Sequence, residues 1–522
     1  MNKDQNFVNR RQFIKGASTA LVGAAVLPLF DPNVVLAADG SLTVAITASV
    51  SSFSPANTKS HDAMAFTQAM FENLMEVDED GQVKPCLATD YQVSNDGLTY
   101  TFNLRDDVYF HNGEKFTAAD VKYSYDHVRD PKTKFMGRRF IWAPIKEVVV
   151  ESPTRVKFLL KRPYWGMLLN MSKYMGVFQN QCVEKYGDKV WMNPVGIGTG
   201  PASFVKWRQN DFAEYKAHKK YWRKGVPAWK KLVIKTIPED TTRVAFLMTN
   251  SVQIIAAPPA REFIALQKMP GITGGSRPTL GGQLTIEPNV NKKPWDDANF
   301  RIAVSKAIDR EAIKKLYAGE FDPFAVVNGF TGWPRDEKAN AHLEYDLASA
   351  KEYMAKSKYA DGVETDIVIP ATPYLVSIAD AALLIQSQLK KIGVKINLRT
   401  LDTGSFWGKY KNNKPFDTTM VVMMTPPNPH YLFTQSYYTG AFIARGKGIS
   451  IPEFDKMVDK TYTANSQAEF DRYIEQMQAF LAREAYGIVI GGAFAQNLWR
   501  SEVKGFKVNA GVAMRVRNVI PG

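Results

Sequence analysis

Few residues of this 522-residue chain have the types and spacing that covalent chemistry needs. Ser501 and Lys504 have the spacing of a serine nucleophile and its lysine base, but the companion motifs S-D-N and K-T-G are absent and the pair lies near the end of the chain. Neither G-x-S-x-G nor H-E-x-x-H occurs, and the six histidines include no pair at metal-ligand spacing. We therefore expect no enzyme activity, no cofactor and no metal site, with a periplasmic hydrolase as the least favoured alternative.

Three glycines, Gly196, Gly198 and Gly200, have the alternate spacing of a dinucleotide-binding loop. Pro201 stands where the next glycine would be, and the residues after it have the pattern of a strand. A phosphate would need the N-terminus of a helix at this point. The sequence therefore argues against a nucleotide site here.

The composition is that of a folded globular protein, with 45% hydrophobic and 12% aromatic residues. The net charge of +14 could suit nucleic acid, an anionic membrane or an acidic ligand. Because the lysines are scattered along the chain, we interpret them as a basic solvated surface and expect no nucleic-acid partner. Two cysteines, Cys86 and Cys182, are too few for a disulfide scaffold, and a single bridge between them stays open.

The elements that would position a site have their clearest pattern over residues 98–131. Alternating apolar and polar residues predict a strand over 100–104, and a turn follows at 111–113. Thr117 and Asp120 have the spacing of a capping box, which predicts a helix after them. Comparable patterns predict a strand over 42–46, a hairpin over 148–160, a helix over 300–308, and a helix ended by Gly393 before a strand over 394–398.

The string LRDDVYFHNGEKFTAADVKYSYDHVRDP, residues 104–131, resembles the signature of the family 5 extracellular solute-binding proteins. These are the peptide-, opine- and nickel-chelate-binding components of ABC importers, and Asp107 and Asn112 are small departures from their usual pattern. Further matches follow in the expected order, at Phe71–Leu74, Pro85–Ala88, Gly198–Pro201, Tyr221–Trp222 and Ala307–Arg310. The resemblance covers nearly the whole chain after its N-terminal segment.

The N-terminal segment, residues 1–37, has the features of an export signal. Asn9–Lys15 resembles the twin-arginine motif, and the apolar run from Ala17 to Phe30 is too short to span a bilayer core of about 30 Å. Val35–Ala37 offers small residues for cleavage, and no cysteine follows for a lipid anchor. We expect export by the twin-arginine route to a Gram-negative periplasm, without a lipid or membrane anchor.

The resemblance implies an α/β fold with two lobes, a hinge and an extra inserted subdomain. The implied boundaries are residues 38–71 with 179–289 and 499–522 for a discontinuous lobe I, 72–178 for subdomain II and 290–498 for lobe III. The implied mechanism is closure of the lobes on a small ligand and delivery to permease subunits of an ABC importer in the inner membrane. We expect a monomer.

The ligand site is expected around residues 416–433, FDTTMVVMMTPPNPHYLF. Relatives that carry peptides place an aspartate here to pair with the α-ammonium group of the peptide, and Thr425 stands at that position. A neutral hydroxyl cannot replace that charge-assisted bond, so ordinary free peptides are disfavoured. The predicted ligand contacts are Lys59, Ser60, His61, Arg138, Trp407, Lys411, Met423, Met424, Thr425 and Asn428.

Several interpretations stay open at this point. Basic candidates outnumber acidic ones, which favours an anionic group on the ligand. Lys59 and His61 could instead be solvated loop residues, Arg138 beside Trp142 could be surface charge, and the run Met420–Met424 could be a buried strand instead of a ligand wall. A nickel-chelate carrier is the closest alternative function, and a chaperone built on the same fold is another.

Overall fold

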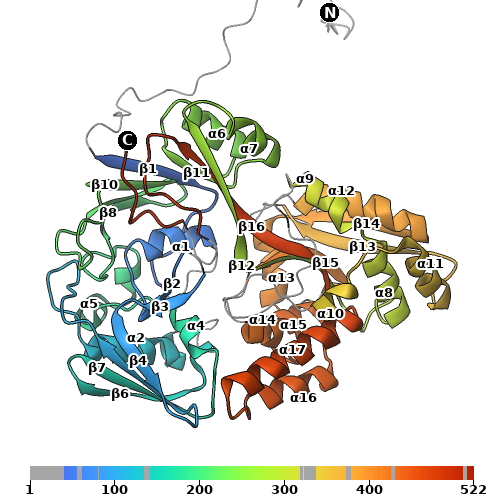
Figure 1. Cartoon of the computed structure of the whole chain (residues 1–522), viewed down its shortest axis with the longest axis horizontal. Helices are drawn as coiled ribbons and strands as arrows, with labels where there is room; N and C mark the ends of the chain where they lie inside the picture. Colours follow the sequence, from blue (N-terminus) through green and yellow to red (C-terminus); the bar gives the residue numbers. More distant parts are fainter. Residues whose placement is uncertain are drawn as a thin grey trace, which may run out of the picture. The chain divides into compact units, whose positions relative to one another are not determined.

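The computed structural model (Figure 1) describes residues 40–55, 61–79, 81–133, 141–317, 321, 337–371, 378–412, 414, 416–424, 429–509 and 514–522. The chain divides into Met1–Leu36 and Ala37–Gly522, and all the described residues belong to the second unit. The predicted export signal, residues 1–37, lies outside the described residues.

One mixed sheet of ten strands has the order β14-β13-β15-β12-β16-β11-β1-β10-β9-β8. β1 runs parallel to β10 and β11, whereas β9 runs antiparallel to both β10 and β8. The strands are β1 Ser41–Ile46, β8 Ala202–Arg208, β9 Phe212–Ala217, β10 Lys231–Thr236, β11 Ile254–Ala256, β12 Ile272–Pro288, β13 Val363–Pro370, β14 Val394–Leu401, β15 Thr418–Met424 and β16 Ile488–Arg500.

Two smaller sheets lie between β1 and β8 in the chain. One is a pair formed by β2 Met75–Val77 and β3 Val83–Pro85. The other has the order β4-β5-β7-β6 and is antiparallel throughout, with the strands β4 Ala88–Val93, β5 Thr99–Leu104, β6 Ile145–Ser152 and β7 Arg155–Leu160.

Helices connect and cover these strands. In the first part of the chain they are α1 His61–Gln68, α2 Ala118–Arg129, η2 Pro131–Thr133, α4 Met167–Met171, α5 Asn180–Tyr186, η3 Gly187–Trp191, α6 Asp240–Met248 and α7 Ala260–Leu266. After β12 they are α8 Ala298–Ala307, α9 Arg310–Leu316, α10 Glu337–Ala341, α11 Leu347–Lys356, α12 Ile378–Leu389, η4 Lys390–Ile392, α13 Thr403–Lys411, α14 Pro429–Tyr437, α15 Phe442–Lys447, α16 Pro452–Thr461 and α17 Gln467–Arg483.

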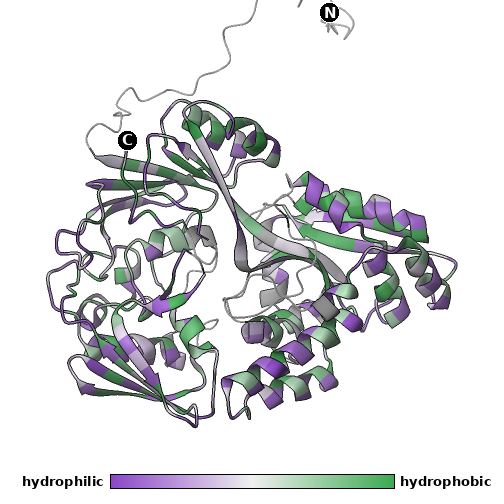
Figure 2. Ribbon diagram, viewed as in Figure 1, coloured by the Kyte–Doolittle hydropathy of each residue, from purple (hydrophilic) through white to green (hydrophobic). Residues whose placement is uncertain are grey.

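The helices are amphipathic, as packing on one side requires. α17 buries Phe470, Ile474, Met477 and Leu481, which recur every three or four residues and so lie on one face. Figure 2 shows the same helix carrying hydrophobic and hydrophilic residues together. Its apolar face belongs to the core, and its polar face needs no partner.

The hydrophobic core has three main clusters. The first joins β1, α1 and the four-stranded sheet, and the C-terminal residues Val516 and Val519 are buried in it. The second lies around α8, α12 and the β12–β15 pair, and the third lies around α14, α16 and α17. We call the residues around the first cluster the first half, and those around the second and third clusters the second half.

Two strands, β12 and β16, carry the sheet from one half to the other, and Figure 1 shows them as long neighbouring strands in green and red. Their antiparallel register slips between Pro278 and Gln283, and again between Leu284 and Thr285. Such bulges bend a strand and interrupt its ladder. The sheet therefore changes register where the two halves are joined. We call this stretch, from Pro278 to Thr285 of β12 with the facing residues of β16, the crossing.

The local predictions from sequence are confirmed. β1, β5, the β6–β7 hairpin and α8 form where the patterns placed them, and Gly393 ends η4 in the left-handed region at φ +76°. The capping box of α2 is present, with the Thr117 amide donating to Asp120 Oδ2 at 3.0 Å. Cys86 and Cys182 are both buried and unbridged, which settles the question left open above.

Candidate functional site

The predicted ligand contacts fall mostly on segments of which the structure says little. Five of them lie outside the described residues, namely Lys59, Ser60, Arg138, Thr425 and Asn428. Four have a described backbone but no described side chain: His61 begins α1, Lys411 ends α13, and Met423 and Met424 end β15. For these nine residues, contact with a ligand stays a prediction.

Trp407 is the one predicted contact for which the structure describes the side chain. It lies half-buried on α13 and packs against a small cluster of Val368, Phe406, Phe416, Val421 and Ile443. Its ring meets that of Phe406 edge to face, with centroids 5.2 Å apart. This cluster holds α13 against β15, so the structure brings together two of the predicted segments.

β15 itself is buried on both faces over its middle. Met420 and Val422 face the second core cluster, whereas Val421 faces the cluster around Phe406. These three side chains are therefore core residues. Of the two interpretations of the run Met420–Met424, a buried strand and a ligand wall, the buried strand is correct for them. Trp142, which follows Arg138 closely in the sequence, is likewise buried in the first core cluster against Tyr125.

The end of β15 lies at the crossing. Met424 pairs with Gly282 and Met423 pairs with Gln283, which also pairs with Gly492 of β16. Gln283 is the first residue of β12 after the larger register slip. The predicted ligand segment after Met424 thus continues from the place where the sheet bends.

A buried ion pair stands behind the same segment. Lys447 of α15 donates to Glu287 of β12 at 2.5 Å, and their side chains are 1% and 3% exposed. The Tyr437 hydroxyl lies 3.4 Å from the same carboxylate, and the Lys447 ammonium lies 4.1 Å from the Tyr437 ring centroid. Burial lowers the pKa of Lys447, which the charge of Glu287 opposes. The pair fixes α14 and α15 on β12, and α14 begins at the residue after Asn428, the last of the predicted ligand contacts.

A buried arginine ties the neighbouring helix to the crossing. The Arg310 guanidinium donates to the carbonyls of Val489, Ser305, Ile308 and Leu343, at 2.9, 2.9, 3.2 and 2.5 Å. Burial lowers the pKa of Arg310 to about 9. Arg310 is the last residue of the Ala307–Arg310 match to the family pattern, so the sequence singled it out. The sequence did not indicate its four carbonyl partners.

The structure also assembles a polar cluster around Glu72 and Glu76 that sequence analysis missed. Burial raises the pKa of Glu72, although Trp222 and Tyr221 donate to its carboxylate. Burial alone would also raise the pKa of Glu76, but Arg517 and Arg223 lower it to about 2. The one indication of Glu72 in the sequence was the Phe71–Leu74 match. That match predicts core packing but does not indicate the partners of Glu72, which lie far away in the sequence.

Two histidines far apart in sequence meet edge to face. The rings of His111 and His218 lie 4.8 Å apart, and His111 Nε2 lies 2.9 Å from the Gly200 carbonyl oxygen. Burial and the neighbouring His218 lower the pKa of His111 to about 3. Among the described residues, no group of three or more His, Cys, Asp or Glu side chains could hold a metal ion, so this pair lacks a third ligand of that kind.

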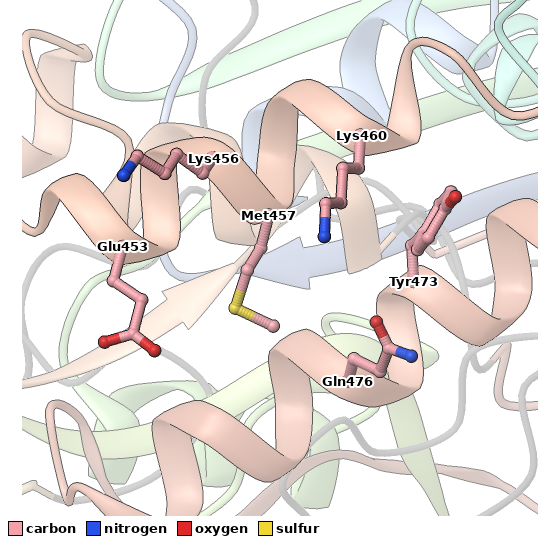
Figure 3. Close-up of a pocket in the computed structure, with 6 residues that line it drawn as sticks. All are labelled: Glu453, Lys456, Met457, Lys460, Tyr473 and Gln476. Carbon is pink, nitrogen blue, oxygen red and sulfur yellow. The ribbon is translucent and has the colours of Figure 1, made fainter.

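A surface pocket of about 280 Å³ lies between α16 and α17 (Figure 3). Its lining is mixed, with two lysines, one glutamate and three uncharged side chains: Glu453, Lys456, Met457, Lys460, Tyr473 and Gln476. Trp407, the predicted ligand contact with a described side chain, does not line it. In the part of the chain that the structure describes, no helix combines the length and hydrophobicity of a membrane span.

Comparison with known proteins gives consistent matches. The family model described as bacterial extracellular solute-binding proteins, family 5 middle, matches residues 82–444. The glutathione-binding protein GsiB of Salmonella typhimurium is 30% identical over 375 residues, which are 70% of each chain.

Two solved structures add to this. AgaA of A. tumefaciens R10 in complex with agropinic acid has a TM-score of 0.77 at 23% identity, covering 92% of this chain and 99% of that one. NikZ of Campylobacter jejuni in complex with Ni(L-His) has a TM-score of 0.76 at 23% identity, covering 90% and 96%. These likenesses confirm the predicted two-lobed α/β fold.

Proposed function

Because the chain belongs to the bacterial extracellular solute-binding proteins of family 5, we propose that it captures a small organic solute of the peptide and opine class and delivers it to an ABC importer. The observation that carries the proposal is the crossing, where β12 and β16 join the two halves and change register beside the end of β15. A bend at this place moves one half against the other without breaking either core.

Closure follows from where the ligand contacts are predicted to lie. Lys59, Ser60, His61 and Arg138 come from the first half, and the remaining six come from the second. A ligand that touches both groups binds the closed form better than the open form, and so shifts the population towards closure. The permease subunits of the importer would then recognise the closed form, and no covalent step is needed.

The ligand class follows from charge. The predicted contacts include Lys59, Arg138 and Lys411 but no acidic residue, which favours an anionic solute. Thr425 offers no charge for a free α-ammonium group, which disfavours ordinary peptides. Glutathione is the first compound to test, because the relative named above binds it. It also carries an α-ammonium group, but its two carboxylates give it the net negative charge that suits a basic site.

The remaining parts of the proposal concern organisation. Lobe I comprises residues 38–71, 179–289 and 499–522, subdomain II comprises 72–178, and lobe III comprises 290–498. The protein acts as a monomer in a Gram-negative periplasm after twin-arginine export and cleavage before residue 38.

The decisive experiment is native mass spectrometry of gently purified mature protein, followed by calorimetry. We expect a co-purifying small organic anion, and micromolar or tighter binding of glutathione or an opine with weak binding of dipeptides. Lys411→Gln should weaken binding about tenfold through loss of one charge-assisted bond, whereas Lys414→Gln, an exposed neighbour, should not. Tight binding of ordinary dipeptides, or turnover of any bound compound, would refute the proposal.

Nickel-chelate binding is the second candidate, favoured by the likeness to the nickel–histidine complex of NikZ. With no metal-holding group of acidic, histidine or cysteine side chains among the described residues, nickel would have to arrive inside an organic chelator. Metal analysis of protein purified with its native ligand distinguishes the two, because an organic solute leaves no stoichiometric nickel.

A further inference from the structure

A second contact joins the two halves at residues away from the crossing. The loop after β7 meets the connection between α16 and α17 and the start of α14. The Arg162 guanidinium lies 3.3 Å from the centroid of the Tyr462 ring, and Trp165 Nε1 donates to the Ala464 carbonyl at 3.2 Å. The rings of Tyr164 and His430 lie 5.6 Å apart. We call these six residues the latch: Arg162, Tyr164, Trp165, His430, Tyr462 and Ala464.

The packing across the latch is reciprocal. Trp165 belongs to the first half in sequence but packs against the third core cluster. Tyr462, from the second half, packs against both the first and the third clusters, and Tyr431 of α14 packs against the first. Each half therefore covers apolar surface of the other, which favours the joined state.

The first-half side of the latch is held in place by its own neighbours. The Tyr164 hydroxyl accepts from Asn170 at 2.9 Å, and the Tyr164 carbonyl accepts from the Tyr100 hydroxyl at 3.1 Å. Gly97, at φ +65°, lies under the Trp165 ring, where a Cβ would come within 2.9 Å of the indole. The loop thus presents its aromatic side chains in a fixed arrangement before any partner arrives.

The second-half side is equally ordered. His430 Nε2 lies 2.8 Å from Thr461 Oγ1, and its ring also meets Tyr462 edge to face at 5.0 Å. Burial, with Arg162 nearby, lowers the pKa of His430 to about 3, so the imidazole is neutral and does not repel the guanidinium. Ser466 caps α17 by accepting from the Glu469 amide at 3.2 Å, which fixes the loop that carries Ala464.

The latch differs from the crossing in how it can move. It is made of side-chain contacts, namely the indole hydrogen bond and ring contacts, between segments far apart in the sequence. None of its six residues lies in a strand. Its contacts can therefore part as a group when the crossing bends, whereas the backbone ladder of β12 and β16 stays joined. His430 is also the second residue of α14, which starts at the residue after Asn428, a predicted ligand contact.

We propose that the latch forms on closure and sets how long a bound ligand is retained, a proposal that rests on the solute-binding function above. The latch adds contacts that exist in the closed form alone, so it lowers the rate of opening and hence of ligand release. The cation–π contact and the indole hydrogen bond together should slow release about tenfold. The association rate should change little, because most affinity differences between related complexes lie in dissociation.

The test uses mature protein, residues 38–522, carrying Arg162→Gln and Trp165→Phe together. Both substitutions keep much of the side-chain volume while removing the cation–π contact and the indole donor. Lys161→Gln, at the exposed neighbour, is the matched control. Thermal melting without ligand checks that all variants fold. With glutathione as probe, we expect dissociation about tenfold faster in the double variant and association within about twofold.

A measurement without ligand tests the latch proposal independently of which ligand the protein binds. Without ligand the latch stabilises the fraction of the protein that is closed, so its loss lowers that fraction. Hydrogen exchange at residues 461–466 should therefore quicken in the double variant and not in the control, and X-ray scattering should shift towards a larger radius of gyration. If glutathione binds and its release rate is unchanged, the latch proposal is wrong. If glutathione does not bind, the ligand assignment fails, and unchanged exchange and scattering in the double variant would then overturn the latch by themselves.

Discussion

The two halves meet at the crossing and at the latch, and different kinds of interaction form the two contacts. The crossing is a backbone ladder backed by the buried ion pair of Glu287 and Lys447 and by the guanidinium of Arg310. The latch is a set of side-chain contacts, and its cation, Arg162, is exposed. In the proposed mechanism the crossing sets the axis about which the halves move, and the latch shifts the balance between the open and closed forms.

Burial decides what each contact contributes to stability. A buried charge that loses its partner is costly, whereas an exposed charge exchanges its partner for water. Changes at the crossing should therefore lower the free energy of unfolding, and changes at the exposed Arg162 of the latch should alter ligand release with little effect on folding. Four predictions test this contrast.

The largest effect is expected for Lys447→Met, which leaves Glu287 buried without its cation. We expect a loss of about 3–5 kcal/mol in the free energy of unfolding, measured in urea. The double variant Glu287→Gln with Lys447→Met removes both charges and should recover part of the loss. Equal losses in the single and double variants would show that the charge pair is not the cause.

The next largest effect is expected for Arg310→Met, which removes the guanidinium donor from four carbonyls around a buried side chain. We expect a loss of about 2–4 kcal/mol in unfolding free energy and faster hydrogen exchange around Val489. Arg399→Met, at an exposed arginine paired with Asp366, serves as the control and should cost less than about 1 kcal/mol. A cost for Arg310→Met as small as that of the control would contradict the prediction.

A smaller loss is expected for Gly487→Ala, just before β16. An added Cβ would overlap the hydroxyl of Tyr437, the residue that lies against the Glu287–Lys447 pair. Overpacking of this kind costs about 1–3 kcal/mol. Gly408→Ala on α13 is the control, because no atom lies within 4 Å of its added Cβ. The two melting temperatures, compared with that of the parent protein, check the prediction.

The smallest effect near neutral pH concerns the latch side, and it grows as pH falls. The pKa of His430 is about 3 in the folded protein, whereas an unfolded histidine has a pKa of about 6.5. Between these values the unfolded chain binds more protons, so this stability is complete above pH 6.5 and is lost as pH falls. The slope is at most about 1.4 kcal/mol per pH unit.

His430→Phe should remove this part of the acid sensitivity, and His342→Phe, at an exposed histidine, should not. Urea unfolding at several pH values between 4 and 7 measures the slope for each variant. Identical slopes in His430→Phe and the parent protein would assign the acid sensitivity to other groups.

The sequence predicts those parts of the fold that depend on neighbours in the chain. The capping box of Thr117 and Asp120 joins residues three apart, and the alternation in β5 lies within six residues, so both were visible in the sequence. The partnership of Glu287 with Lys447 spans 160 residues, and nothing in either local pattern indicates it. Arg310 appeared as a motif, but its role depends on Val489, which lies 179 residues away.

The candidate site was less predictable for a related reason. The segments that resemble ligand loops lack the periodic patterns that specify strands and helices, so sequence alone gives their composition without their geometry. Met420 and Val422 show the limit within one strand. Their apolar character fits a ligand wall and a buried core equally well, and burial on both faces of β15 decides for the core.

The path of the chain through the first half bears on when the protein can fold. Val516 and Val519 complete the first core cluster, Arg517 pairs with Glu76 at 2.7 Å, and β16 supplies the neighbour of β11. The first half therefore lacks part of its interior until the ribosome has made residues 516–519. Synthesis must reach these residues before this half can become native, an order of events that suits a protein proposed to leave the cytoplasm already folded.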